Sequence, residues 1–331
     1  MTTPIKITGS SVLPVGPAKT VTTPTKPVTE AGEFTLADVD PVGRTEVILY
    51  GPPKSGKTVC AATFPGPFRW VAADGENSLK SVRWAYKAGL TSLTALDQLR
   101  AYAPREDTSD AERYYPKSAK AFWEMQDRIG FWFTSEQVDK WETLVIDSLT
   151  EVNLWALNLG LDLNNQLPNV SHPLSGSHAI NLKAKVRLVT GQQDYKSAMG
   201  LIEGFITDIR GECAKHGKNL VMICHEWTET KEGEDGTERV VRYRPLLIGQ
   251  LREQMAKAFD DVWHVRQYKT PTTNRATGGQ EVKVLMHADP THIAGTRWGA
   301  CVNAEEPADY RQIIAKVKAY HATENAKGDT T

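Results

Sequence analysis

The residues best suited to chemistry lie in one stretch, GPPKSGKT at positions 51–58. This stretch fits the pattern G-x-x-x-x-G-K-[ST] at every fixed position. Glycines let the backbone turn its N–H groups toward phosphate oxygens, and a following helix adds its positive end. The lysine would reach the β- and γ-phosphates of ATP, and the threonine hydroxyl would ligate Mg²⁺. The predicted nucleotide-binding residues are Gly51, Pro52, Pro53, Lys54, Ser55, Gly56, Lys57, Thr58 and Val59.

A second signature of phosphate chemistry, an aspartate, follows about 90 residues after the P-loop, at the end of the apolar run Thr143–Asp147. A short run that is apolar throughout is typical of a parallel strand buried on both faces. Asp147 would hold Mg²⁺ together with Thr58, usually through a water. A solvated aspartate at a strand end is the alternative, but the neighbouring P-loop favours the metal role.

Two more predicted strands, 68–73 and 219–224, also end in polar residues. In an open parallel sheet, ligands bind at the carboxyl ends of the strands. Glu76 is the candidate for activating the attacking water, and His225 for sensing the γ-phosphate. The alternatives are an exposed carboxylate and a half-buried histidine. The polar residues at the three strand ends are Asp74, Glu76, Asp147, His225 and Glu226.

The elements that would position these residues alternate between strand and helix from 46 to 265. Alternation predicts an α/β fold with a mostly parallel sheet flanked by helices, and the C-terminal part should add antiparallel edge strands. Helices are expected at 93–101, 118–133, 149–159, 192–216, 246–259 and 310–320, strands at 261–265 and 282–286, and a hairpin turn at 234–236.

Composition sets the boundaries of the folded part. Residues 1–33 are rich in Thr, Pro, Val and Lys, which predicts a disordered arm before a domain at 34–321 and a flexible tail at 322–331. The net charge of −1 gives no overall basic field, so nucleic-acid contacts would need local patches. Four scattered cysteines suit reduced, buried thiols, and no run approaches 18 apolar residues, so we expect a cytoplasmic protein without a membrane span.

The chain resembles the RecA-like core, and within it the phage-encoded, AAA-type P-loop ATPases related to single-strand annealing and recombination proteins. The matching segments are GPPKSGKT (51–58), FRWVAADGE (68–76), TLVIDSLTEV (143–152), QQDYKSAMGLI (192–202), NLVMICHE (219–226), PLLIGQLREQMAKAFDDVWHV (245–265) and HADPTHIAGTRWG (287–299). The resemblance implies a RecA-like fold and Mg²⁺-dependent ATP hydrolysis on single-stranded DNA in phage recombination or replication. It also implies a homo-oligomeric ring or filament in the bacterial host's cytoplasm, with a phage single-strand-binding protein as a further partner.

By the same resemblance, Glu76 is the catalytic base and His225 couples the γ-phosphate to DNA-facing loops at about 161–190 and 227–244. The basic and aromatic residues of these loops are Lys183, Lys185, Arg187, Arg239, Arg242, Tyr243 and Arg244. Such residues can grip phosphate and stack a base, but five acidic residues share the hairpin, so an exposed hairpin of mixed charge is an equal alternative. Arg297 would be an arginine finger for a neighbouring subunit. The proteins that the chain resembles tend to have a lysine two residues before this arginine, but here that position is Gly295.

Two other functions stay open at this point. The chain could be a nucleotide-gated DNA- or protein-binding module with negligible hydrolysis, although a glutamate at 76 speaks against it. It could also be a small-molecule kinase with an arginine-bearing lid in 77–141, but a strand ending in His-Glu and followed by a hairpin suits the RecA-like pattern better.

Overall fold

The computed structural model describes residues 40, 42–104, 117–163, 192–233, 236–269 and 280–328. The chain divides into two units, Met1–Asp40 and Pro41–Thr331, and the fold described below is that of the second. The predicted arm at 1–33 lies outside the described residues, as does most of the predicted DNA-facing loop at 161–190.

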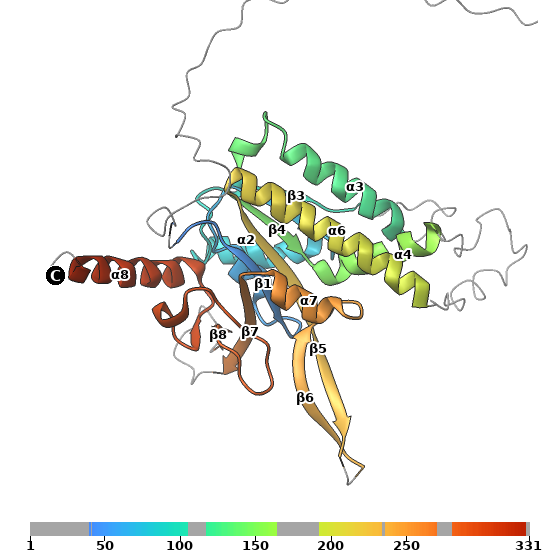
Figure 1. The fold of residues 1–331 in the computed structure, drawn as a ribbon. Coiled ribbons are helices and arrows are strands. Elements are labelled where there is room, and N and C mark those ends of the chain that lie inside the picture. Colours follow the sequence, from blue (N-terminus) through green and yellow to red (C-terminus); the bar gives the residue numbers. More distant parts are fainter. Residues whose placement is uncertain are drawn as a thin grey trace, which may run out of the picture. The chain divides into compact units, whose positions relative to one another are not determined.

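One sheet organises the compact unit, with strand order β3-β2-β4-β5-β1-β7-β8-β9 and β6 paired to β5 (Figure 1). Strands β3, β2, β4, β5, β1 and β7 are parallel to one another, whereas β6, β8 and β9 pair in the antiparallel direction. The predicted α/β fold is therefore confirmed, including its antiparallel C-terminal edge. The strands are β1 (Glu46–Gly51), β2 (Phe68–Ala72), β3 (Leu99–Tyr102), β4 (Thr143–Asp147), β5 (Asn219–Glu232), β6 (Glu238–Pro245), β7 (Asp261–Lys269), β8 (Gln280–Leu285) and β9 (Glu305–Pro307).

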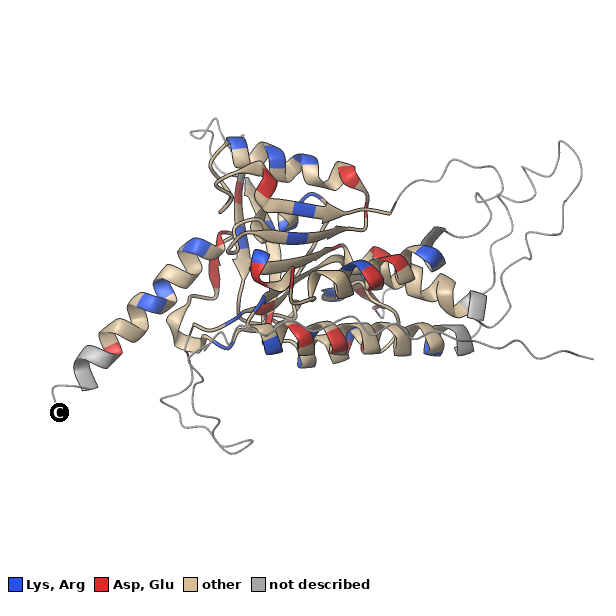
Figure 2. Cartoon of the chain, turned by 90° about the horizontal axis from the view of Figure 1, so that it is seen from above, with Lys and Arg blue, Asp and Glu red and all other residues tan. Residues whose placement is uncertain are grey.

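Helices cover both faces of the sheet, and charged residues of both signs are interspersed along them (Figure 2). One face carries α3 (Lys117–Trp132), α4 (Leu149–Leu163), α6 (Gln192–His216) and α7 (Leu251–Ala258). The other face carries α1 (Lys57–Ala61), α2 (Lys80–Lys87) and α8 (Tyr310–Gly328).

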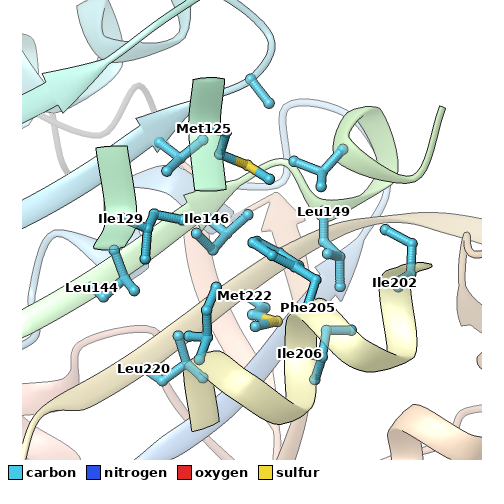
Figure 3. Packing of buried hydrophobic residues seen from close by; sticks show 14 of the residues in the cluster. Met125, Ile129, Leu144, Ile146, Leu149, Ile202, Phe205, Ile206, Leu220 and Met222 are labelled. Carbon is cyan, nitrogen blue, oxygen red and sulfur yellow. The ribbon is translucent and has the colours of Figure 1, made fainter. Parts of the chain in front are cut away.

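The alternation of side chains along the strands explains why both faces need a cover. Ile48 and Tyr50 of β1 belong to the core under α3, α4 and α6, while Val47 and Leu49 belong to the core on the opposite face. All six residues of β1 are buried, as expected for a central parallel strand with apolar residues on both faces. Figure 3 shows the first of these cores, where Ile202, Phe205 and Ile206 meet strand residues such as Met222.

Several predicted elements differ from the observed ones. The predicted helix 93–101 is wrong: a short 3₁₀ turn (Leu96–Gln98) leads into edge strand β3, which pairs with β2. Helix α7 begins at Leu251 rather than 246, because the Leu246 N–H bonds the His225 carbonyl at 2.8 Å. Helix α4 continues to Leu163, and α8 runs to Gly328, into the stretch expected to be a tail. The predicted helix 192–216 is confirmed.

Candidate nucleotide-binding site

The loop between β1 and α1 has the geometry that its glycines allow. A Cβ at Gly51 would lie 2.5 Å from the Val265 carbonyl oxygen, so no side chain fits there. Gly56 has φ +99°, and Lys54 has φ +64°, so the backbone turns through left-handed conformations twice within three residues. Such turns direct successive N–H groups into a concavity that suits an anion.

Lys57 follows this loop and is held against it. Its Nζ donates to the carbonyl oxygens of Gly51 at 2.8 Å and Pro52 at 2.7 Å. Burial lowers the pKa of Lys57 to about 8, and the charge of Asp147 acts in the opposite direction. The ammonium group therefore contacts the loop itself, and its predicted reach to the phosphates stays a prediction.

Thr58 and Asp147 meet although 89 positions separate them. The Thr58 Oγ1 donates to Asp147 Oδ2 at 3.0 Å. Oxygens at adjacent corners of an octahedron of Mg²⁺ ligands, at about 2.1 Å from the ion, are also about 3 Å apart. Asp147 is almost fully buried, and burial, followed by the charge of Asp74, raises the pKa of Asp147 to about 7. The pair therefore fits a magnesium ion.

The sheet register explains why these groups converge. Strand β5 lies between β1 and β4, and it pairs Gly51 with His225 and Asp147 with Ile223. On the other side of β4, Asp147 pairs with Ala72, the last residue of β2. The carboxyl ends of β1, β2 and β4 therefore lie side by side, next to His225 within β5. The predicted end of this strand at 224 is wrong, because pairing with β6 continues β5 to Glu232.

Asp74 connects two of these strand ends. Its carboxylate accepts a hydrogen bond from Ser148 Oγ at 3.1 Å and lies 3.8 Å from His225 Nε2. Thr150 Oγ1 accepts a hydrogen bond from the His225 backbone N–H at 2.9 Å. Burial, followed by the positive charge of Lys57, lowers the pKa of His225. Sequence reasoning placed Asp74 at the strand end but gave it no role. It also missed Ser148 and Thr150, whose only signal was their position directly after Asp147.

Comparison with known proteins agrees with this geometry. Residues 44–298, more than half of the chain, match the family described as AAA domain. The chain belongs to the AAA domain family. This membership indicates nucleotide binding and hydrolysis, consistent with the P-loop at the sheet edge. No curated protein matches the chain.

In this AAA domain, Glu76 lies close to the site in sequence but is not held in it. It is the first residue of the 3₁₀ turn η2 (Glu76–Leu79), directly after β2, and its side chain is exposed. Within the part of the chain that the structure describes, it takes part in no hydrogen bond or ion pair. Its position at the correct strand end agrees with the prediction, and its catalytic role stays a prediction.

Arg297 lies at the amino ends of β1 and β7, whereas the P-loop lies at the carboxyl end of β1. Its guanidinium contacts Asp260 at 2.8 Å and Asp261 at 3.6 Å, and it donates to the Arg44 carbonyl at 3.1 Å. Asp261 pairs with Val47, four residues before Gly51, or about 13 Å along β1. The structure therefore does not bring Arg297 to the P-loop of its own chain.

Strands β5 and β6 pair as a hairpin, as predicted, although residues 234 and 235 of the turn lie outside the described residues. The basic residues of the hairpin differ in accessibility. Arg244 is buried and pairs with Glu229 at 2.9 Å and Glu253 at 2.7 Å. Tyr243 stacks on His292, with ring centroids 4.5 Å apart, which covers one face of its ring. Arg239 and Arg242 are exposed.

These contacts limit the predicted DNA surface. Arg244 could bind a phosphate only by leaving two carboxylates, and Tyr243 has one ring face for stacking rather than two. The predicted DNA-binding residues Lys183, Lys185 and Arg187 lie outside the described residues. Among the described residues, no helix is long and apolar enough to cross a bilayer.

Proposed function

We propose that this AAA domain is a Mg²⁺-dependent ATPase that acts on single-stranded DNA in phage recombination, annealing or replication. The observation that carries the ATPase part is the hydrogen bond from Thr58 to Asp147, beside the Lys57 ammonium. It brings two hard oxygen donors and one cation to a loop whose backbone can surround phosphates.

In this proposal Lys57 neutralises charge on the β- and γ-phosphates, and the Thr58 and Asp147 oxygens hold Mg²⁺. The ion supplies Lewis-acid stabilisation of the phosphate oxygens when bound. Glu76 orients or deprotonates the attacking water after η2 moves its carboxylate inward. His225, held near Asp74, responds to the γ-phosphate and passes the change along β5 into the hairpin, because both belong to one continuous strand.

Support for a nucleic-acid substrate is the hairpin that extends from this strand. Arg239 and Arg242 are exposed on β6 and offer phosphate contacts. Binding would depend strongly on salt, because phosphate contacts dominate the affinity of such surfaces. We further propose a homo-oligomeric ring or filament in the bacterial host's cytoplasm, in which Arg297 reaches a neighbour's nucleotide.

The test is phosphate release from ATP, measured with and without single-stranded DNA at low salt. Lys57→Ala should lose turnover, whereas Glu76→Gln should bind ATP and hardly hydrolyse it. Lys80→Ala provides a matched control, because it removes an exposed lysine outside the motif. Normal turnover by the Glu76 variant would remove Glu76 as the base. Absence of DNA binding at low salt, with or without ATP, would remove the nucleic-acid part of the proposal.

A second candidate function is a nucleotide-gated binding module in which ATP orders the hairpin and hydrolysis is negligible. The observation that favours it is the exposed position of Glu76, without a partner among the described residues. DNA binding that depends on ATP, without phosphate release above the Lys57→Ala background, would select this function instead.

A further inference from the structure

A cluster of possible metal ligands lies beside the nucleotide site and takes no part in it. It consists of Glu226 on β5, His264 on β7 and His292 in the segment after β8. One potential ligand atom from each residue lies within 4.8 Å of the other two. We propose that this Glu–His–His cluster binds a divalent transition-metal ion of the zinc type. The proposal does not depend on the proposed ATPase function.

The geometry requires only small movements to surround an ion. Glu226 Oε2 and His264 Nε2 are 2.5 Å apart, and the ring centroids of His264 and His292 are 4.4 Å apart. In a tetrahedral site with ligand distances of about 2.0 to 2.1 Å, the ligand atoms are about 3.3 Å from one another. The cluster therefore needs separations to change by about 1 to 1.5 Å, which side-chain rotation provides.

The surroundings of His292 resemble those of metal-binding histidines. The Asp289 carboxylate lies 2.9 and 3.0 Å from His292 Nδ1, and its Oδ1 also accepts from the His292 backbone N–H at 2.6 Å. A carboxylate on one ring nitrogen fixes the tautomer and leaves the other nitrogen, Nε2, as the ligand. Asp289 is itself held by Arg266 at 2.6 Å.

The charges around the cluster sum to the value that a divalent cation would balance. Glu226, Asp289 and Glu305 each contribute one negative charge, and Arg266, which contacts Asp289 and Glu305, contributes one positive charge. With neutral histidines the total is about −2. Of the three carboxylates, Glu226 is the most buried, with a side chain 13% exposed, so its charge is the least screened by water and attracts a cation most strongly.

The donor set selects the class of metal. Two imidazoles and one carboxylate match three-ligand zinc sites, with a fourth position for water. Mg²⁺ and Ca²⁺ prefer oxygen donors alone, so they should compete poorly.

Metal binding requires Arg266 to give up one hydrogen bond. Its Nε donates to His264 Nδ1 at 3.1 Å, which places the imidazole proton on Nε2. Metal binding through Nε2 moves that proton to Nδ1, so the Arg266 Nε must turn away. The ion pairs of Arg266 with Asp289 and Glu305 can keep the guanidinium nearby.

An ion in this cluster would join three segments that are distant in sequence. Glu226 follows His225 directly, and His292 supports Tyr243 of β6. The ion would therefore stiffen the base of the hairpin next to the nucleotide site.

The experiment uses full-length protein that has been treated with a chelator and is kept in millimolar Mg²⁺. The protein is titrated with Zn²⁺ against a chromophoric indicator, and a second titration uses Co²⁺ as a spectroscopic probe. Wild type should bind one equivalent with high affinity. His292→Ala should lose this equivalent, and Asp289→Asn should weaken it by about 10- to 100-fold. Because His264 is buried and its replacement could prevent folding, His292→Ala and Glu226→Gln are the primary variants, each checked by circular dichroism.

The control variant is His321→Ala. His321 Nε2 lies 3.7 Å from Cys301 Sγ, so this thiol–imidazole pair is an alternative place for zinc to bind. Zinc binding that is retained in His292→Ala and Glu226→Gln but lost in His321→Ala would overturn the proposal. Absence of a high-affinity equivalent in folded wild type, or full competition by Mg²⁺, would also overturn it.

Discussion

Replacing Asp147 by asparagine should stabilise the nucleotide-free protein, although it removes a predicted magnesium ligand. Burial, followed by the charge of Asp74, raises the pKa of Asp147 from 3.8 to about 7. A raised pKa in the folded state means that the native protein favours the protonated carboxyl. The stability that this group contributes is therefore full below about pH 3.8 and is lost as the pH rises through 7.

The magnitude follows from the size of the shift. Each pKa unit corresponds to about 1.4 kcal/mol, so the ionised carboxylate destabilises the fold by about 4 kcal/mol at pH 7.5. At about pH 5 the same linkage leaves about 2 kcal/mol. Asparagine does not titrate, so the stability gain of Asp147→Asn over wild type should shrink by about 2 kcal/mol between these two conditions. If the asparagine side-chain N–H has no partner, the cost is the same at both pH values. The difference between the two stability gains is therefore unchanged.

Urea unfolding in the presence of a chelator, followed by tryptophan fluorescence at both pH values, measures the difference. The surface variant Asp139→Asn is the matched control, because it makes the same substitution at an exposed carboxylate. A gain for Asp147→Asn that is the same at both pH values would refute the reasoning. In a parallel thermal unfolding experiment, Mg²⁺ and ATP should stabilise wild type more than the variant, because only wild type keeps the carboxylate.

Three further outcomes are expected. Lys57→Ala should reduce ATP turnover by at least about 100-fold, since it removes the cation at the phosphates, and a phosphate-release assay checks this. Arg297→Ala should destabilise the fold by about 1 to 3 kcal/mol, because buried Asp261 loses its cation. If Arg297 also acts in trans, mixing this variant with Lys57→Ala should restore turnover, and a mixture as inactive as its components would contradict that role. Met222→Ala should cost about 2 to 5 kcal/mol in urea unfolding, because Met222 of β5 is fully buried in the core that α6 covers.

Local sequence patterns were sufficient to predict the P-loop and the fold class. The motif at 51–58 identifies its own chemistry, since each fixed position has a physical task within eight residues. Runs such as Thr143–Asp147 identify buried parallel strands, because strands with helices on both faces must be apolar throughout. The same signals failed at 93–101, where pairing with β2 overrides a helical pattern and produces the edge strand β3.

By itself, the sequence determined that Gly51 and Asp147 stand at strand ends, because these ends follow from local patterns. It did not determine the end of β5, which pairing with β6 extends past His225. Only the tertiary structure decided which of these ends are neighbours. The insertion of β5 between β1 and β4 sets the register that brings Asp147 within 3.0 Å of Thr58. Packing also decided that Arg244 is buried and that Glu226, His264 and His292 form a cluster, because burial and long-range contacts depend on how distant segments fold together.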